Sequence, residues 1–297
     1  MSPSTSENEK PTQTETDLIV AALENPQHIQ KVVSEAIILG GGAAAILLQV
    51  AHPSVAKGVN YHSSFAQRPV DRLRTTMTYV YSMLYGTAKE KKKIIELVHR
   101  AHASIKGPDY EADDPSAQLW VAATLYAIAI DLYEQIFGVL DEERAEAVYR
   151  EYVVLGASLR VPVEMWPKNR EAFWTYWDEQ LAGFEICDEA KTVAQDLLYN
   201  PKLPFYFKVM MPTLRLFTAE LLPPKLRDAY NLKTSKGRRT LYKSTMVMTK
   251  ATYPFMPKGL RTYPVKHYMK DMRKRMAKYG EAQRKISVPV TELLLLE

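Results

Sequence analysis

The stretch Pro115–Phe137, PSAQLWVAATLYAIAIDLYEQIF, decides the fold of this 297-residue chain. Its apolar side chains cover a broad part of the helix surface, which is typical of a helix buried among other helices. Asp114 and Pro115 suit the N-cap and the first position of such a helix. The sequence therefore predicts a long central helix that the other elements surround.

Helical periodicity recurs along the rest of the chain, whereas strand-like alternation is rare. We predict further helices over residues 27–39, 43–50, 55–65, 70–85, 89–105, 142–155, 167–184, 188–199, 205–221, 224–230, 236–248 and 265–277. Residues 1–17, rich in Ser, Thr, Glu and Pro, are expected to form a disordered tail without the features of a secretory signal. The expected fold is all-α, a single-domain multi-helix bundle over residues 18–297.

Charge is unevenly divided along the chain. Residues 225–285 contain 18 Lys and Arg against three Asp and Glu, a net charge of +15 that leaves −10 for the remainder. Such a basic third either contacts an anionic membrane surface peripherally or is a solvated surface. No nucleic-acid-binding motif accompanies it, so we expect no nucleic-acid partner. The single cysteine, Cys187, excludes an internal disulfide and favours a cytoplasmic location.

Three consecutive glycines, Gly40 to Gly42, separate the first two predicted helices. They lack the G-x-G-x-x-G spacing and no strand precedes them, which excludes a dinucleotide-binding fingerprint. Residues this small let the chain pack very closely against another helix or a flat ligand.

The HRAH segment, His99 to His102, lies in the predicted helix 89–105, which we expect to end at Gly107 and Pro108. His102 shares an apolar face with Ile94, Val98 and other residues at helical spacing. Two interpretations remain open here. His102 is either a core histidine with a hydrogen-bond partner or a neutral imidazole that ligates iron in a dry pocket.

The predicted helix 70–85 places Arg72, Thr76, Tyr79 and Met83 on one face. Two interpretations are open. Either Arg72 and Thr76 point their polar groups into an apolar pocket, or Arg72 lies on the surface and the threonine hydroxyl bonds to the backbone of its own helix. The chain contains no nucleophile elbow, P-loop or H-E-x-x-H motif. A dinuclear carboxylate site needs two Glu-x-x-His pairs, and only Glu96 with His99 fits that spacing.

Several segments between about residues 35 and 180 resemble one family, that of the rubber oxygenases (latex clearing proteins) and the fungal MpaB-type oxygenases. The matching segments are GGGAAAILLQVAHPSVAKGV (40–59), HSSF (62–65), RPVDRLRTT (68–76), HASIKG (102–107), DYEADDPSAQLWVAATL (109–125) and ERAEAVYREY (143–152). The resemblance implies an all-α bundle that encloses a pocket for haem b. It also implies oxidative cleavage of carbon–carbon double bonds with O2.

By this resemblance His102 is the proximal iron ligand, and Arg72 with Thr76 forms a distal catalytic pair that also contacts the cofactor. His62 is counted among the cofactor-binding residues, although for it and for His52 a structural hydrogen bond is the first expectation. The rubber-cleaving branch has a distal lysine where this chain has Thr75, which argues against rubber as the substrate. A frequent family histidine is replaced by Ala122.

The function that the resemblance implies is a haem b-dependent oxygenase. Its expected substrates are O2 and a hydrophobic unsaturated small molecule of secondary metabolism, cleaved at a C=C bond. One alternative is a haem enzyme that catalyses a redox-neutral rearrangement, a dehydration or a hydroxylation. Another is a non-enzymatic haem- or lipid-binding helical protein.

Overall fold

A computed structural model describes residues 25–62, 69–200, 203 and 205–286, and within them it confirms the all-α fold. The α-helices are α2 (His28–Val33), α3 (Gly42–Gln49), α4 (Pro53–His62), α5 (Pro69–Tyr85), α6 (Ala88–His102), α7 (Pro115–Phe137), α8 (Glu142–Ala157), α9 (Arg170–Gly183), α10 (Asp188–Tyr199), α11 (Phe205–Leu221), α12 (Pro224–Ala229), α13 (Lys236–Thr252), α14 (Lys258–Arg261) and α15 (Tyr263–Ile286). Three short 3-10 helices join them: η1 (Ala36–Gly41), η2 (Val163–Met165) and η3 (Tyr253–Phe255). The predicted tail, residues 1–17, lies outside the described residues.

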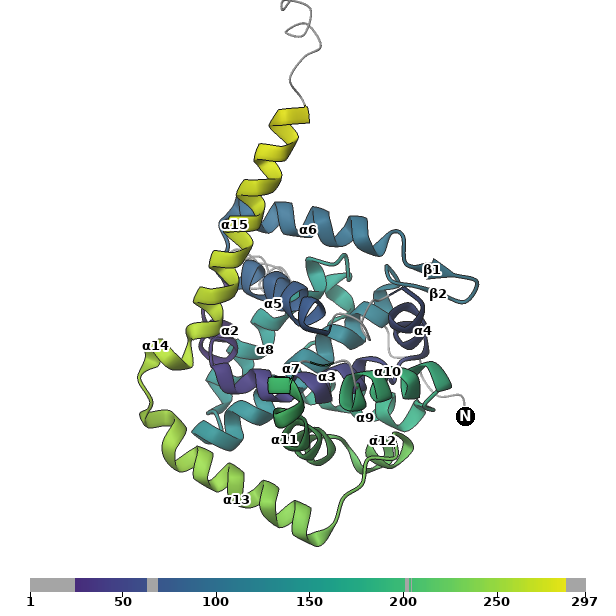
Figure 1. Ribbon diagram of the computed structural model, residues 1–297, viewed down its shortest axis with the longest axis vertical. Helices are drawn as coiled ribbons and strands as arrows, with labels where there is room; N and C mark the ends of the chain where they lie inside the picture. The colour runs from purple at the N-terminus through teal and green to yellow at the C-terminus, as the bar shows by residue number, and fades with distance from the viewer. Residues whose placement is uncertain (1–24, 63–68, 201–202, 204, 287–297) are drawn as a thin grey trace, which may run out of the picture.

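Helix α7 is the centre of the bundle, as predicted (Figure 1). Asp114 caps its N-terminus by accepting a hydrogen bond from the Ser116 amide at 2.8 Å, and Pro115 is its first residue. By length and composition α7 is apolar enough to cross a membrane, but 72% of that stretch is buried within the bundle. Other helices of this protein therefore cover its apolar surface.

The triple glycine brings η1 and α3 against α7. A Cβ added at Gly41 would lie 2.4 Å from Ile128 and 2.7 Å from Leu132, so only glycine fits this approach. Trp120 on α7 also donates a hydrogen bond from its indole N–H to the Leu48 carbonyl at 2.7 Å. Of the two partners that we expected for the triple glycine, a helix or a flat ligand, the structure shows a helix, α7.

The helix predicted over 27–39 is wrong in its extent, because α2 and η1 divide this stretch. The backbone of Glu35 is extended between them, and its buried carboxylate pairs with Arg261 at 3.2 Å. This long-range ion pair turns the chain, and it leaves no trace in local periodicity.

Helix α6 begins at a capping box, in which Thr87 and Glu90 bond each other's backbone amides, and it ends at His102. The prediction that Gly107 and Pro108 end this helix is wrong. Lys106–Gly107 (β1) instead pairs antiparallel with Tyr110–Glu111 (β2) in a short hairpin. A Cβ at Gly107 would lie 2.3 Å from the Tyr110 ring, so the glycine makes room for that ring.

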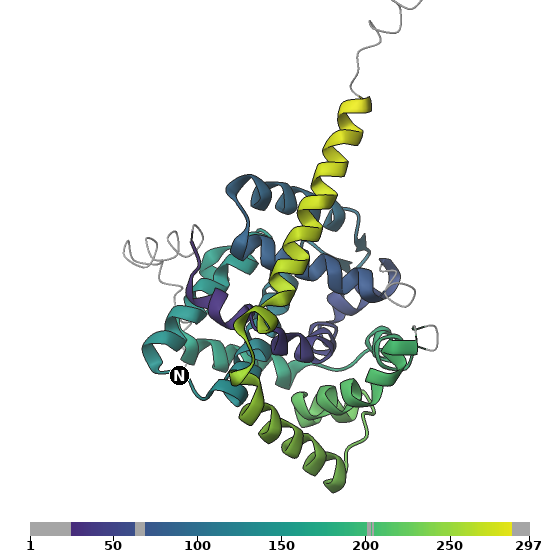
Figure 2. The same cartoon turned by 60° about the vertical axis from the view of Figure 1, so that its left-hand side comes forward.

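The basic C-terminal region forms the outer part of the bundle. Helix α13 lies along its lower edge and α15 crosses α5 before extending beyond the body (Figures 1 and 2). Asp271 on α15 accepts hydrogen bonds from Arg74 on α5 at 2.7 Å and from Arg275 at 3.0 Å. The Arg74–Asp271 ion pair fastens α15 to α5, whereas the Arg275–Asp271 pair lies within α15.

Candidate functional site

His102 is the last residue of α6, and its ring faces the N-terminus of α7. Its Nδ1 atom lies 3.4 Å from the Gln118 amide nitrogen and 3.8 Å from an Asp113 carboxylate oxygen. One quarter of the side chain is exposed, and no described residue forms a hydrogen bond with Nε2. One ring nitrogen therefore faces polar partners from α7, and the other stays available.

Burial lowers the pKa of His102, and the positive charges of Arg72 and His99 lower it further, against an opposing effect of Asp113. The imidazole is therefore neutral at neutral pH and keeps one nitrogen lone pair. The Gln118 amide nitrogen can only donate to Nδ1, whereas the Asp113 carboxylate can only accept from it, so these two partners favour opposite tautomers. Ligation of a metal through Nε2 requires the hydrogen on Nδ1, which is the tautomer that Asp113 favours.

The Gln118 side chain lies beside the Nδ1 edge of the His102 ring. Its amide nitrogen donates a hydrogen bond to the Ala112 carbonyl at 2.7 Å, which fixes the orientation of the amide. The amide oxygen is buried and has no hydrogen-bond partner among the described residues. Such an unsatisfied acceptor is costly, and it marks the polar end of the region around His102.

Arg72 lies near the start of α5 and is exposed to solvent. Protein atoms nevertheless surround its guanidinium closely enough that burial lowers the pKa of this group. Since its charge also acts on His102, α5 and α6 bring these two predicted site residues to the same region. No carboxylate of the described residues forms an ion pair with Arg72.

The shared face of α5 runs from the exposed Arg72 into the core. Thr76 is half-buried one turn after Arg72, whereas Tyr79 and Met83 are buried. The threonine that bonds its own helix is Thr75, whose hydroxyl donates to the Arg72 carbonyl at 2.9 Å. The structure therefore places Arg72 and Thr76 on one face, as predicted.

Two other histidines have protein partners. His99 lies on α6 one turn before His102, and its Nε2 atom is 3.1 Å from the Ser158 carbonyl. His62 is exposed at the end of α4, with Nε2 at 2.9 Å from the Tyr110 hydroxyl. Among the described residues no contact joins His62 to Arg72 or His102, so its role in cofactor binding stays a prediction.

His52 lies between α3 and α4. Its Nδ1 atom is buried without a hydrogen-bond partner in the described part of the chain, so the hydrogen bond that we expect is not seen there. Its ring meets Phe184 edge-on at a centroid distance of 6.0 Å. Burial lowers the pKa of His52, and the negative charge of Asp114 opposes this shift. The neutral form is therefore favoured.

Asp113 and Gln118 are site residues that the sequence did not indicate. Asp113 immediately precedes the N-cap of α7 and Gln118 lies near its start, and only the folded chain brings them to His102. No group of three or more His, Cys, Asp or Glu that could hold a metal ion occurs in the described ranges. Glu96 and His99 therefore have no further metal ligands near them among the described residues. The described residues offer a metal a single histidine ligand.

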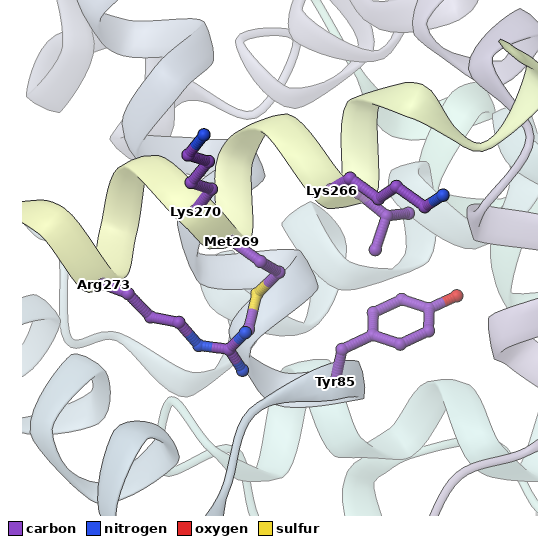
Figure 3. A pocket seen from close by; sticks show the side chains of 6 residues that line it. Tyr85, Lys266, Met269, Lys270 and Arg273 are labelled. Carbon is purple, nitrogen blue, oxygen red and sulfur yellow. The ribbon is translucent and has the colours of Figure 1, made fainter. Parts of the chain in front are cut away.

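A separate cavity of about 410 Å³ lies between α15 and the end of α5 (Figure 3). It is lined by Tyr85, Val265, Lys266, Met269, Lys270 and Arg273. Tyr85 follows Arg72 by thirteen residues on α5, about 20 Å away at the rise of an α-helix. Arg273 pairs with Glu90 at 2.8 Å. This cavity is distinct from the region around His102.

Comparison with known proteins identifies the family. The sequence profile described as "ER-bound oxygenase mpaB/B'/Rubber oxygenase, catalytic domain" matches residues 30–251. The chain belongs to this family. Two uncharacterized relatives, from Mycobacterium bovis and Mycobacterium tuberculosis, are each 30% identical over 248 residues, covering 80% of this chain and 97% of theirs. No solved structure matches.

The mpaB/rubber oxygenase region contains Arg72, Thr76 and His102, and it ends before η3, α14 and α15. At the level of the family, the chain is an oxygenase and hence an oxidoreductase. At the position of the replaced family histidine, Ala122 is buried, with its Cβ 3.8 Å from the site of a Cβ at Gly156 on α8.

Proposed function

We propose that this chain is a haem b-dependent oxygenase that cleaves a C=C bond of a hydrophobic small molecule with O2. The observation that carries the proposal is Arg72, a partly desolvated cation without an ion-pair partner among the described residues, whose charge acts on His102. A desolvated guanidinium without a counter-charge is costly, so such a site is built to receive a negative group. A haem propionate, or charge that develops during O2 chemistry, meets this need.

The residues present fit haem. His102 would hold the iron through Nε2, while Asp113 beside Nδ1 orients the ring and increases its basicity. The chemistry that haem supplies when bound is the activation of O2 at iron. Leu73 and Leu97 keep 36% of their surface exposed on α5 and α6, so apolar surface is available on both helices for a hydrophobic ligand.

On the opposite side, Arg72 and Thr76 would act as the distal pair. The guanidinium keeps its positive charge in this setting and stabilises negative charge that develops in the transition state. The Thr76 hydroxyl, half-buried one turn further along α5, would supply a hydrogen-bond donor to the same region. Thr75 is bonded to its own helix and is shorter than a lysine, so it would not take the place of a lysine ligand.

The test is oxygen labelling with the haem-loaded protein and a panel of hydrophobic alkenes. Oxidative cleavage consumes O2 and places one atom from ¹⁸O2 in each of the two carbonyl products. Product formation without O2 consumption would instead support a redox-neutral rearrangement or dehydration, and a single labelled oxygen would indicate hydroxylation. Absence of any turnover, with haem bound, would contradict the proposal.

A further inference from the structure

The C-terminal surface is basic and lacks carboxylates. Residues 229–270 contain ten Lys and Arg and no Asp or Glu. Two of these cations pair with acids elsewhere in the bundle, Arg239 with Glu220 and Arg261 with Glu35. Along α13 and α14, the exposed Lys236, Lys243, Lys250 and Lys258 form no ion pair with any described residue. A strong positive potential therefore remains on this side.

The same segment exposes large apolar side chains, most of all Phe255, which is 85% exposed. The others are Leu241, Val247, Met248, Met256, Leu260 and Tyr263. We call residues 236–263, from α13 through η3 and α14, the α13–α14 face. It lies along the lower left edge of the molecule in Figure 1, and α13 keeps its place at the lower edge in Figure 2.

The two kinds of side chain are ordered along α13. Lys236, Lys243 and Lys250 recur every seven residues, which places them in one row along the helix. Leu241 and Met248, also seven residues apart, form a second row. The opposite side of α13 packs on the bundle through the buried Tyr242 and Met246. The two rows lie roughly 150° apart around the helix, so they flank its outward side, and the exposed Val247 lies next to the lysines.

We propose that the α13–α14 face docks peripherally on an anionic phospholipid membrane. Phe255 and Leu260 insert at the level of the lipid headgroups, and the lysine row binds their phosphates. A second copy of the chain fits poorly, because it would bring two lysine rows together. Nucleic acid fits less well because five of the seven exposed apolar residues are aliphatic and offer no ring on which bases stack.

The experiment is flotation of the full chain with vesicles of phosphatidylcholine and phosphatidylglycerol, compared with vesicles of phosphatidylcholine alone. We expect binding to the anionic vesicles that weakens as salt is added, because screening acts on the lysine contacts. Failure to float with the anionic vesicles overturns the proposal. So does equal binding to both vesicle types, since the lysines would then contribute nothing.

Variants locate the surface. Replacement of Lys243, Lys250 and Lys258 by Gln should weaken partition on the order of a hundredfold, at roughly fivefold for each lysine. Phe255→Ser with Leu260→Ser should also abolish flotation without changing thermal unfolding, because both side chains are exposed.

Matched controls are available on other elements. Lys89→Gln with Lys92→Gln removes two exposed lysines of α6, on the side of the molecule away from α13 in Figure 1. Phe205→Ser removes a phenylalanine of similar exposure, 81%, from α11. Both controls should float like the unmodified chain. If a control loses binding as strongly as the face variants, or if the face variants change only the oligomeric state, the α13–α14 face is not the membrane contact.

Discussion

Replacing Gly41 by alanine should destabilise the bundle, whereas the same change at Gly42 should not. An added Cβ at Gly41 would lie 2.4 Å from Ile128 and 2.7 Å from Leu132, whereas at Gly42 nothing lies within 4 Å. Both α7 side chains are buried, with 6% and 1% of their surface exposed. They cannot move aside without disturbing the core around α7.

The magnitude follows from these distances. Carbon atoms prefer separations of about 3.5–4.0 Å, so the new methyl group must displace its neighbours by roughly 1 Å. Overpacking of this kind costs about 1–3 kcal/mol. Alanine gains about 0.5–1 kcal/mol over glycine in a helix, and this gain applies to Gly42→Ala as well. The two variants should therefore differ by about 1–3 kcal/mol in free energy of unfolding, or roughly 2–12 °C in Tm.

Thermal unfolding followed by circular dichroism measures this difference directly. Gly42→Ala serves as the matched control, because it changes the same residue type next to the site. Equal Tm values for the two variants would refute the close contact of Gly41 with α7. A lower Tm for Gly42→Ala would refute it as well.

Three further predictions concern the site. Arg72→Ala should retain haem but lose turnover by about 10²–10³-fold, because it removes the cation that stabilises developing charge; steady-state kinetics with unchanged turnover would contradict this role. Asp113→Asn should weaken haem binding by about 10–100-fold and raise the reduction potential, since the proximal ligand becomes less basic; haem titration and redox potentiometry check both. Burial lowers the pKa values of His52 and His102, so the unfolded, haem-free chain binds more protons than the folded chain. Its free energy of unfolding should fall as the pH decreases below 6.5, the ordinary value for histidine, and His52→Gln should flatten this fall in urea titrations.

Local signals predicted most of the helices. Helices α10 and α11 begin and end at the predicted residues, and α7 starts at the predicted cap. The errors occur where a distant group determines the backbone. Glu35 turns the chain toward Arg261, and Tyr110 folds back over Gly107 after α6 has ended. Periodicity carries no information on such contacts.

The residues of the candidate site also fall into two groups, those that the sequence could predict and those that depend on contacts between distant segments. Arg72 and Thr76 could be predicted because helical spacing places them on one face, and the family resemblance adds His102. Asp113 and Gln118 could not, because their contact with His102 depends on how α6 meets the start of α7. The exposure of the apolar row of α13 could not be predicted either, because periodicity does not distinguish an exposed apolar face from one that packs on the bundle.

The measurement that bears most directly on the proposed haem site is haem content by the pyridine haemochrome assay, for the unmodified chain, His102→Ala and His99→Ala. The two histidines lie one turn apart on α6, but His99 meets the Ser158 carbonyl, so its replacement controls for damage to the helix. We predict about one haem b per chain in the unmodified protein and in His99→Ala, and none in His102→Ala. Full haem content with an unchanged spectrum in His102→Ala would contradict the assignment of His102 as the iron ligand.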